Sequence, residues 1–307
     1  MFRTLFAIAL AHSLATFSGS SLAFDGNVER AGQGIESPQA TVVISGQRMQ
    51  DGPELELKIT QFVQSHATRT RIDQLARWHG AICPQALGLP NAQAAFVSMR
   101  IKQVARFANA PVGEPCDLNI TVVFTNEPQQ LLDSLSARNS RMLGYHYVFE
   151  REGVATMRSP IQAWYATGTR GDGGSELDAT PHALYLDDPY RMTPGGRAGS
   201  RLASGLISEL AHVLVLADMK KLEGHPIGAV ADYITLLALS QSNRAAGCGA
   251  LPSILDLLSA CGEQRKPEEL TAADVAYLKA LYDVSSDSVG ASQRRQLIKL
   301  MKYELLK

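Results

Sequence analysis

The spacing of apolar residues changes repeatedly along the chain between a helical and an extended pattern. Apolar residues that recur every three or four positions indicate amphipathic helices, and short alternating or continuous apolar runs indicate strands. The helical pattern predicts helices over residues 54–65, 71–78, 92–108, 128–137, 200–221, 227–241, 275–282 and 291–306. The extended pattern predicts strands over residues 40–45, 119–124, 161–169 and 183–186. Because helices and strands are mixed without strict alternation, we expect an α+β fold or an irregular α/β fold.

Two local signals support the boundaries of these helices. Pro226 suits the first turn of the helix expected over 227–241, since its fixed φ and missing N–H are tolerated there. Thr271, followed three residues later by Asp274, has the spacing of a capping box and predicts a helix start at that point.

The first 23 residues have the pattern of a secretory signal peptide. Arg3 supplies a positive charge, residues 5–17 are mostly apolar, and Ser21-Leu22-Ala23 offers small residues for cleavage. The alternative is an uncleaved anchor. No later segment reaches about 18 consecutive apolar residues, which argues against an integral membrane segment in the mature chain. We expect an exported protein, periplasmic or extracellular, with a flexible leader over 24–53 that contains a short strand, and a single domain over 54–307.

Export changes the meaning of the four cysteines, because disulfides persist in oxidising compartments. Cys83, Cys116, Cys248 and Cys261 all lie after the signal, and four cysteines allow three pairings. We favour Cys83–Cys116 and Cys248–Cys261, because each of these pairs is close in sequence. No CxxC motif occurs, so the cysteines suggest neither a thioredoxin-like site nor a zinc site.

Composition excludes several classes of partner. Lys plus Arg number 29 and Asp plus Glu 30, so the chain lacks the basic excess of a nucleic-acid-binding protein. Hydrophobic residues make up 45% and charged residues 19%, as in ordinary globular proteins.

The most informative motif is Ser208-Glu209-Leu210-Ala211-His212, inside the helix expected over 200–221. Two histidines four residues apart on a helix bind zinc, and a Glu between them acts as general base. Here Glu209 and His212 are present, but Ser208 stands at the position of the first histidine.

The stretch around this motif resembles the zincin metallopeptidases, the metzincin branch in particular, over roughly residues 93–285. Segments 100–108 and 119–124 are similar to the first helix and strand of that fold, 161–174 to its edge strand and loop, 183–188 to the strand before the zinc helix, 208–218 to the zinc helix, 252–255 to the Met-turn, and 270–282 to the closing helix. The chain also resembles uncharacterised exported bacterial families with decayed zinc motifs. The resemblance implies an α+β zincin-like domain with a small mixed sheet packed on the zinc helix.

The resemblance leaves the third metal ligand open. Asp218 falls where metzincins place theirs, but Val215 replaces the glycine that turns the chain away. In a continuing helix, Asp218 would lie about 120° around the axis from His212. Asp232, 20 residues after His212, matches the gluzincin spacing instead.

Structural roles compete with these functional ones. His212 would serve as a core histidine bonded to Asp218, Asp232 or a tyrosine, and Glu209 would pair with an arginine such as Arg201. Trp164 and Tyr165 lie on the expected edge strand, where zincins bind an extended peptide, yet at least one of them should face the core.

Our leading hypothesis is a non-catalytic zincin-like pseudoenzyme without a cofactor, which uses its cleft as a peptide-binding or scaffold surface. The alternative is an active zinc metallopeptidase in which Glu209 activates water on a metal held by His212, an aspartate and one unconventional ligand. The third hypothesis is a structural envelope protein.

Overall fold

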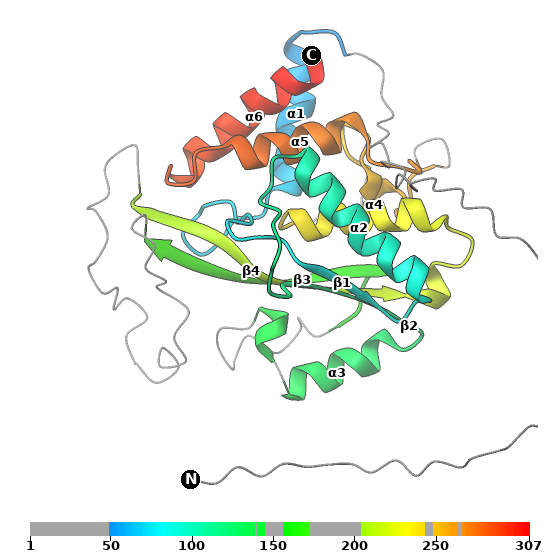
Figure 1. The fold of residues 1–307 in the computed structure, drawn as a ribbon. Coiled ribbons are helices and arrows are strands. Elements are labelled where there is room, and N and C mark those ends of the chain that lie inside the picture. Colours follow the sequence, from blue (N-terminus) through cyan, green and yellow to red (C-terminus); the bar gives the residue numbers. More distant parts are fainter. Residues whose placement is uncertain (1–48, 139, 145–155, 172–203, 243–247, 263–265) are drawn as a thin grey trace, which may run out of the picture. The chain divides into compact units, whose positions relative to one another are not determined.

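A four-stranded mixed sheet organises the computed structural model (Figure 1). Its strands are β1 (Pro84–Leu87), β2 (Ile120–Thr125), β3 (Ile161–Gly171) and β4 (Leu206–Asp218), in the spatial order β1-β2-β4-β3. The first two strands run parallel to β4, whereas β3 pairs with it in the antiparallel sense. Together with the helices, this sheet confirms the expected α+β class.

The structure describes residues 49–138, 140–144, 156–171, 204–242, 248–262 and 266–307. These residues belong to one compact unit, Thr41–Lys307. Several expectations fall outside the described residues: the signal peptide, nearly all of the leader, the strands over 40–45 and 183–186, the loop that follows Gly171, and Arg201.

Helices cover both faces of the sheet (Figure 1). One face carries α1 (Pro53–His66), α2 (Asn91–Phe107), α4 (Ile227–Leu239), α5 (Ala272–Asp283) and α6 (Gly290–Leu306). The opposite face carries α3 (Pro128–Arg138) and the 3-10 helix η1 (Ser140–Leu143). Two shorter 3-10 helices, η4 (Met219–Lys221) and η5 (Ile254–Asp256), flank α4 in sequence.

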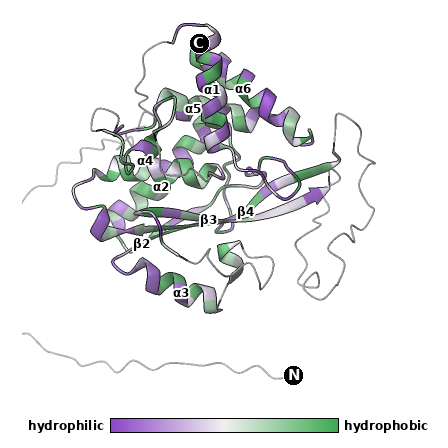
Figure 2. Cartoon of the chain, turned by 180° about the vertical axis from the view of Figure 1, so that it is seen from behind, coloured by the Kyte–Doolittle hydropathy of each residue, from purple (hydrophilic) through white to green (hydrophobic). Residues whose placement is uncertain are grey.

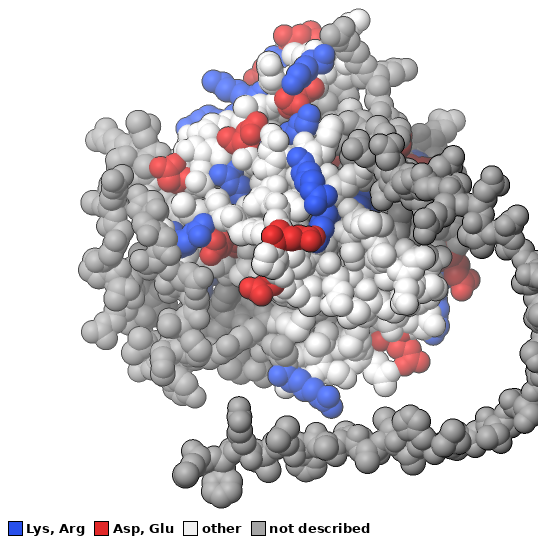
Figure 3. All heavy atoms as spheres, viewed as in Figure 1, with Lys and Arg blue, Asp and Glu red and all other residues white. Residues whose placement is uncertain are grey.

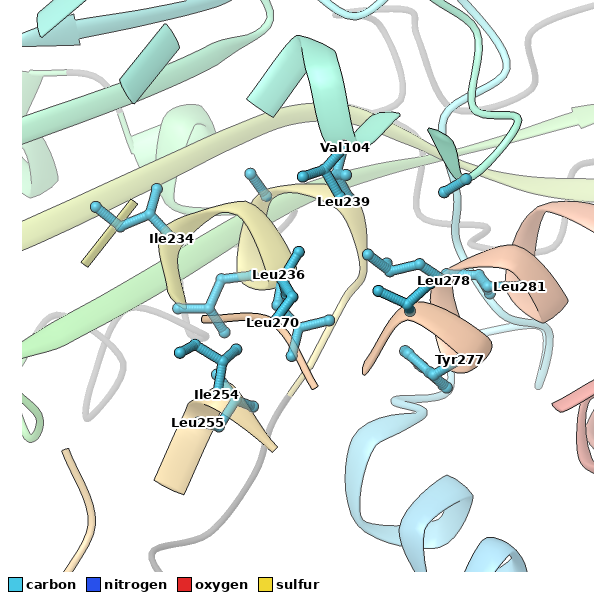
Figure 4. Close-up of a cluster of buried hydrophobic side chains, with 14 of the residues drawn as sticks. Val104, Ile234, Leu236, Leu239, Ile254, Leu255, Leu270, Tyr277, Leu278 and Leu281 are labelled. Carbon is cyan, nitrogen blue, oxygen red and sulfur yellow. The ribbon is translucent and has the colours of Figure 1, made fainter. Parts of the chain in front are cut away.

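Each face of the sheet has its own apolar cluster. The larger one joins the sheet to the five helices above it, and Figure 4 shows part of it, where α4 side chains such as Leu236 meet Ile254 and Leu270. The smaller one consists of Leu132, Leu143, Trp164, Leu214 and Leu216. Figure 2 shows the mixed polarity of α3, which turns an apolar side toward this smaller cluster.

Most of the predicted helices are confirmed. The helices expected over 54–65, 92–108, 128–137, 227–241, 275–282 and 291–306 correspond to α1 to α6. The strands expected over 119–124 and 161–169 correspond to β2 and β3. Thr271 caps α5 as its spacing indicated: its hydroxyl accepts from Asp274 N at 3.2 Å, and its own N–H donates to the Asp274 carboxylate at 3.0 Å.

The helix predicted over 71–78 is wrong. This segment is irregular and bridges to its neighbours at Arg69–Leu75 and Arg77–Glu209. Asp73 has a φ of 62°, a left-handed conformation that a right-handed helix cannot contain.

The helix predicted over 200–221 is also wrong, because Leu206–Asp218 forms β4. Between Val213 and Ala217 every side chain is buried, with the odd-numbered residues in the larger cluster and Leu214 and Leu216 in the smaller one. A strand buried on both faces has a continuous apolar run, and such a run satisfies a helical period as easily as an extended one.

Both favoured disulfides are present. Cys83 pairs with Cys116 across 33 residues, and Cys248 pairs with Cys261 across 13. Two disulfides fit a protein of an oxidising compartment. In the part of the chain that the structure describes, no helix combines the length and apolar character that crossing a membrane requires.

Candidate functional site

The candidate zinc motif, residues 208–212, lies on β4, and a β-bulge interrupts its regular pairing with β3. On β3, Ala166 pairs with His212 and Thr167 with Leu210, so Ala211 is the extra residue of a β-bulge. Side chains along a strand alternate between the two faces of the sheet, and the extra residue shifts this alternation by one position. Leu210 and Val213 therefore share the face of the five-helix layer, whereas His212 shares the α3 face with Leu214.

Ser208 belongs to the five-helix face. Its hydroxyl lies 2.7 Å from the Thr70 hydroxyl, and its N–H donates to Gln74 Oε1 at 2.9 Å. Gln74 also donates to Ser204, Leu206 and Ser288, so it holds the start of β4 to the loop between α5 and α6. The Ser208 side chain thus belongs to a structural network, on the other side of the sheet from His212.

Glu209 forms an ion pair with Arg170 of β3, at 3.3 Å between Oε2 and Nη2. Its pairing position on β3 is Gly168, where an added Cβ would meet the Glu209 side chain at 3.6 Å. Glu209 therefore pairs with an arginine, as its structural role predicts. This arginine is Arg170, and Arg201, the example we gave, lies outside the described residues. The carboxylate is therefore held by an ion pair between two strands of the sheet.

Among the described residues, His212 contacts Thr121 of β2 and neither Asp218, Asp232 nor a tyrosine. Its Nε2 lies 3.3 Å from the Thr121 hydroxyl, while its buried Nδ1 has no hydrogen-bond partner within the described ranges. Burial lowers the pKa of His212, which favours the neutral imidazole. Asp218 lies six residues further along β4, about 20 Å away in an extended strand.

The two candidate aspartates have other partners. Asp218 ends β4 and accepts from Lys220 N at 3.1 Å, with Lys221 Nζ at 3.5 Å. Asp232 is buried on α4, where Arg100 of α2 donates to both of its oxygens and Leu270 N donates at 3.0 Å. The structure therefore does not bring Ser208, His212, Asp218 and Asp232 together.

The aromatic pair of β3 belongs to the core. Trp164 is 3% exposed and packs in the smaller cluster, as we expected for at least one of the two aromatic residues. Tyr165 packs on the opposite face, and its hydroxyl donates to Leu237 O at 3.1 Å. Burial raises the pKa of this hydroxyl well above its ordinary value.

Sequence reasoning missed His79, which follows the segment bridged to β4. Burial, and next the charges of Arg77 and Arg170, lower the pKa of His79 to about 4. Its buried Nε2 has no hydrogen-bond partner in the part of the chain that the structure describes. No motif surrounds it, so only its position beside β4 distinguishes it from other histidines.

Zinc does not fit these residues. Structural and catalytic zinc sites need three or four His, Cys, Asp or Glu ligands in close approach. The described ranges contain no group of three such residues that could hold a metal ion. The cysteines are paired in disulfides, and Glu209 and Asp232 are neutralised by arginines.

Comparison with known proteins adds no assignment: no family model, curated protein or solved structure matches the chain.

Proposed function

We propose that this is an exported, non-catalytic binding or scaffold protein built on a zincin-like order of elements. The chain runs through α2, β2, α3, η1, the antiparallel edge strand β3, β4, η4, α4, η5 and α5. The resemblance implies the order helix, strand, edge strand, strand, zinc helix, Met-turn and closing helix. Residues 208–218, which this resemblance compares with the zinc helix, lie in β4, and the next helix, α4, carries Asp232, the alternative ligand by the gluzincin spacing.

The composition of α4 is the observation that carries this proposal. Its sequence, IGAVADYITLLAL, contains no histidine, and Asp232 is its only acidic residue. The Asp232 side chain is 3% exposed and bound by Arg100 and Leu270 N. The position where a zincin needs ligands is therefore filled by apolar packing and one neutralised acid, which supports a role without metal-dependent hydrolysis.

An extended peptide is the partner that the sheet suits best, because an exposed sheet edge can accept an added strand. The β1 edge is unsuited to this role. Pro84 has no N–H, and Ala86 N already donates to the Ser98 hydroxyl at 3.1 Å. The strand at the opposite edge, β3, has 11 residues.

Within β3, the favoured stretch is residues 167–171. Gly144 lies against the Tyr165 carbonyl and occupies the edge nearer the middle of the strand. Leu210 N donates to Arg77 O, away from β3. Thr167 is the residue of β3 that pairs with Leu210. In an antiparallel pair that exchanges no hydrogen bonds, both residues point their N–H groups away from each other, so the Thr167 N–H points to the open side of β3. The same holds for Thr169, two residues further along the strand.

Metal analysis of the purified mature protein tests the non-catalytic role. We expect no stoichiometric zinc after dialysis against micromolar zinc, and no cleavage of labelled casein. The His212→Ala variant should match the wild type in both measurements. Stoichiometric zinc that is lost in His212→Ala, together with casein cleavage that stops in Glu209→Gln, would establish the metallopeptidase and refute the proposal.

Peptide capture separates a binding role from a structural envelope role. We expect fluorescent casein peptides to bind the mature protein, measured by fluorescence anisotropy. Thr169→Pro removes an outward N–H and should weaken this binding at least tenfold, whereas Thr169→Val keeps the N–H and should bind as the wild type does. Circular dichroism of both variants checks the fold. Absence of binding in the wild type would favour the structural envelope role.

Fractionation of expressing cells is a separate test of localisation, and it would show whether the protein lies in the periplasm or in the medium.

A further inference from the structure

The disulfide between Cys248 and Cys261 joins a surface residue to a core residue. Cys248 is exposed to solvent, whereas Cys261 is 4% exposed. The other disulfide lacks this asymmetry, since Cys83 and Cys116 are both partly buried. A thiolate opens a disulfide by attacking one of its two sulfurs, and the reaction depends on access to that sulfur. Access therefore favours attack at Cys248 Sγ, with Cys261 Sγ as the leaving group.

The buried sulfur lies beside a hydroxyl and a carboxylate. The Ser259 hydroxyl is 2.9 Å from Cys261 Sγ, and Asp256 Oδ1 is 3.6 Å from the same sulfur. The Ser259 oxygen also lies 2.8 Å from Asp256 O, so its one hydrogen can go to either acceptor. If negative charge develops on Cys261 Sγ, this hydrogen can turn to the sulfur and stabilise it. Ser259 is thus placed to help Cys261 leave, whereas the Asp256 carboxylate opposes its charge.

The segment between the two cysteines is also held by contacts other than the S–S bond. The Ser253 hydroxyl donates to Asp274 Oδ1 at 2.6 Å, and Ile254 N donates to Asp274 Oδ2 at 2.7 Å. Ile254 and Leu255 are buried in the larger apolar cluster, beside Leu270 (Figure 4). These contacts join η5 to α5 without the cysteines, so η5 should stay packed when the disulfide opens.

We propose that Cys248 is a site of reversible S-thiolation, at which a small monothiol opens the Cys248–Cys261 disulfide of the folded protein. The thiolate of the monothiol attacks Cys248 Sγ, the bond between the two protein sulfurs breaks, and its electron pair leaves on Cys261 Sγ. Cys261 then takes up a proton, and Cys248 carries the mixed disulfide. One disulfide replaces another, so the step consumes no further oxidant or reductant.

A monothiol is the class of reagent that this site can retain. A dithiol would release itself with its second sulfur and would leave both protein cysteines reduced. With a monothiol, the protein sulfur that can reverse the step is Cys261. The neighbouring Asp256 carboxylate repels the thiolate form that this attack requires. The adduct at Cys248 should therefore be lost only slowly once free monothiol is removed.

Peptide mapping by mass spectrometry tests the site. The mature protein is incubated with reduced glutathione at mildly alkaline pH, and samples are trapped at intervals with N-ethylmaleimide in acidic urea. The first product should carry glutathione on Cys248 and N-ethylmaleimide on Cys261, with Cys83 and Cys116 still joined. Glutathione on Cys261, or earlier opening of the other disulfide, would overturn the proposal. So would a native protein that reacts only after urea has unfolded it.

The isolated adduct tests reversibility on a folded chain. Its circular dichroism spectrum should match that of the wild type, because η5 keeps its contacts with α5. After gel filtration removes free glutathione, incubation at mildly alkaline pH should slowly release one glutathione per protein and restore the Cys248–Cys261 disulfide. An adduct that has lost its fold, or one that never closes again, would refute a reversible site on the native protein.

Two substitutions beside Cys261 test the departure of its sulfur. Ser259→Ala removes the hydroxyl that can stabilise the leaving sulfur, so glutathione should open the disulfide roughly 2- to 10-fold more slowly. Asp256→Asn removes the opposing charge and should speed the opening, while asparagine can still accept from Ser253 N. Ser285→Ala is the matched control, because it removes an exposed serine–aspartate hydrogen bond far from the disulfide in sequence. It should react at the wild-type rate. A Ser259→Ala variant as fast as this control would contradict the assigned leaving group.

Discussion

The Asp232 carboxylate shows how a neighbour determines the role of a residue. By spacing it was a candidate zinc ligand, and in the fold it is the buried partner of Arg100. The guanidinium side chain is 12% exposed and the carboxylate 3%. At this depth a charge without its partner is very unfavourable, so the two residues are useful to the fold only together.

We therefore predict that Arg100→Ala lowers the free energy of unfolding by about 3–5 kcal/mol, because it leaves Asp232 buried and unpaired. The double variant Arg100→Met with Asp232→Asn should recover most of this loss, since asparagine still accepts from Leu270 N. Urea unfolding measures both values. Lys102→Ala is the control, because the carboxylate of its partner Glu114 is exposed to solvent, so this substitution should change the free energy of unfolding far less than Arg100→Ala does. A double variant as unstable as Arg100→Ala would contradict this account.

At the scale of elements, the sequence was informative where a helix has one buried face and a cap. The helices α1 to α6 follow from periodicity, and the α5 start follows from the Thr271 box. The pattern failed for β4, whose second half is buried on both sides by contacts with α3 and the five-helix layer. Those contacts are non-local, so they leave no period in the sequence. The Ser-Glu-Leu-Ala-His spacing has meaning only on a helix, and the candidate zinc site was lost with that helix.

The junction between the 71–78 segment and α6 gives a prediction of the same scale. A Cβ at Gly290, the first residue of α6, would lie 1.7 Å from Asp73 O. Arg294 of α6 holds the same aspartate with two hydrogen bonds to its carboxylate, so the backbone there has little freedom to shift. We predict that Gly290→Ala costs about 1–3 kcal/mol through overpacking.

The matched control is Gly228, which lies in the first turn of α4 and has no atom within 4 Å of an added Cβ. Gly228→Ala should keep or raise stability, by up to about 1 kcal/mol, because alanine has less freedom to lose in a helix. Guanidinium unfolding of both variants decides the matter. Equal effects of the two substitutions would mean that the Asp73 contact does not limit α6.

At the scale of the whole molecule, the sequence predicted the disulfides but not the surroundings of the candidate site. Pairing by proximity in sequence was enough for the cysteines, because each pair closes a local loop. The partners of His212 and Asp232, in contrast, come from β2 and α2, 91 and 132 residues away along the chain. Charge was also predictable at this scale: on the face shown in Figure 3, Lys and Arg are interspersed with Asp and Glu and form no patch of one sign.

The two disulfides close loops of different lengths, so their contributions to stability should differ. Cys83–Cys116 closes a loop that contains β1 and α2, whereas Cys248–Cys261 closes the short segment around η5. In the chain-entropy account, the longer loop restricts the unfolded chain more. Removing the Cys83–Cys116 disulfide should therefore lower the free energy of unfolding by about 4 kcal/mol, and removing Cys248–Cys261 should lower it by about 3 kcal/mol. We predict this order for two double variants, Cys83→Ala with Cys116→Ala and Cys248→Ala with Cys261→Ala. Urea unfolding under oxidising conditions measures their free energies of unfolding. The wild type unfolded in excess thiol is the reference for the loss of both disulfides. If the short loop proved the more costly, native contacts that it enforces around η5 would outweigh chain entropy, and the bonding of Ser253 to Asp274 would be the first place to look for them.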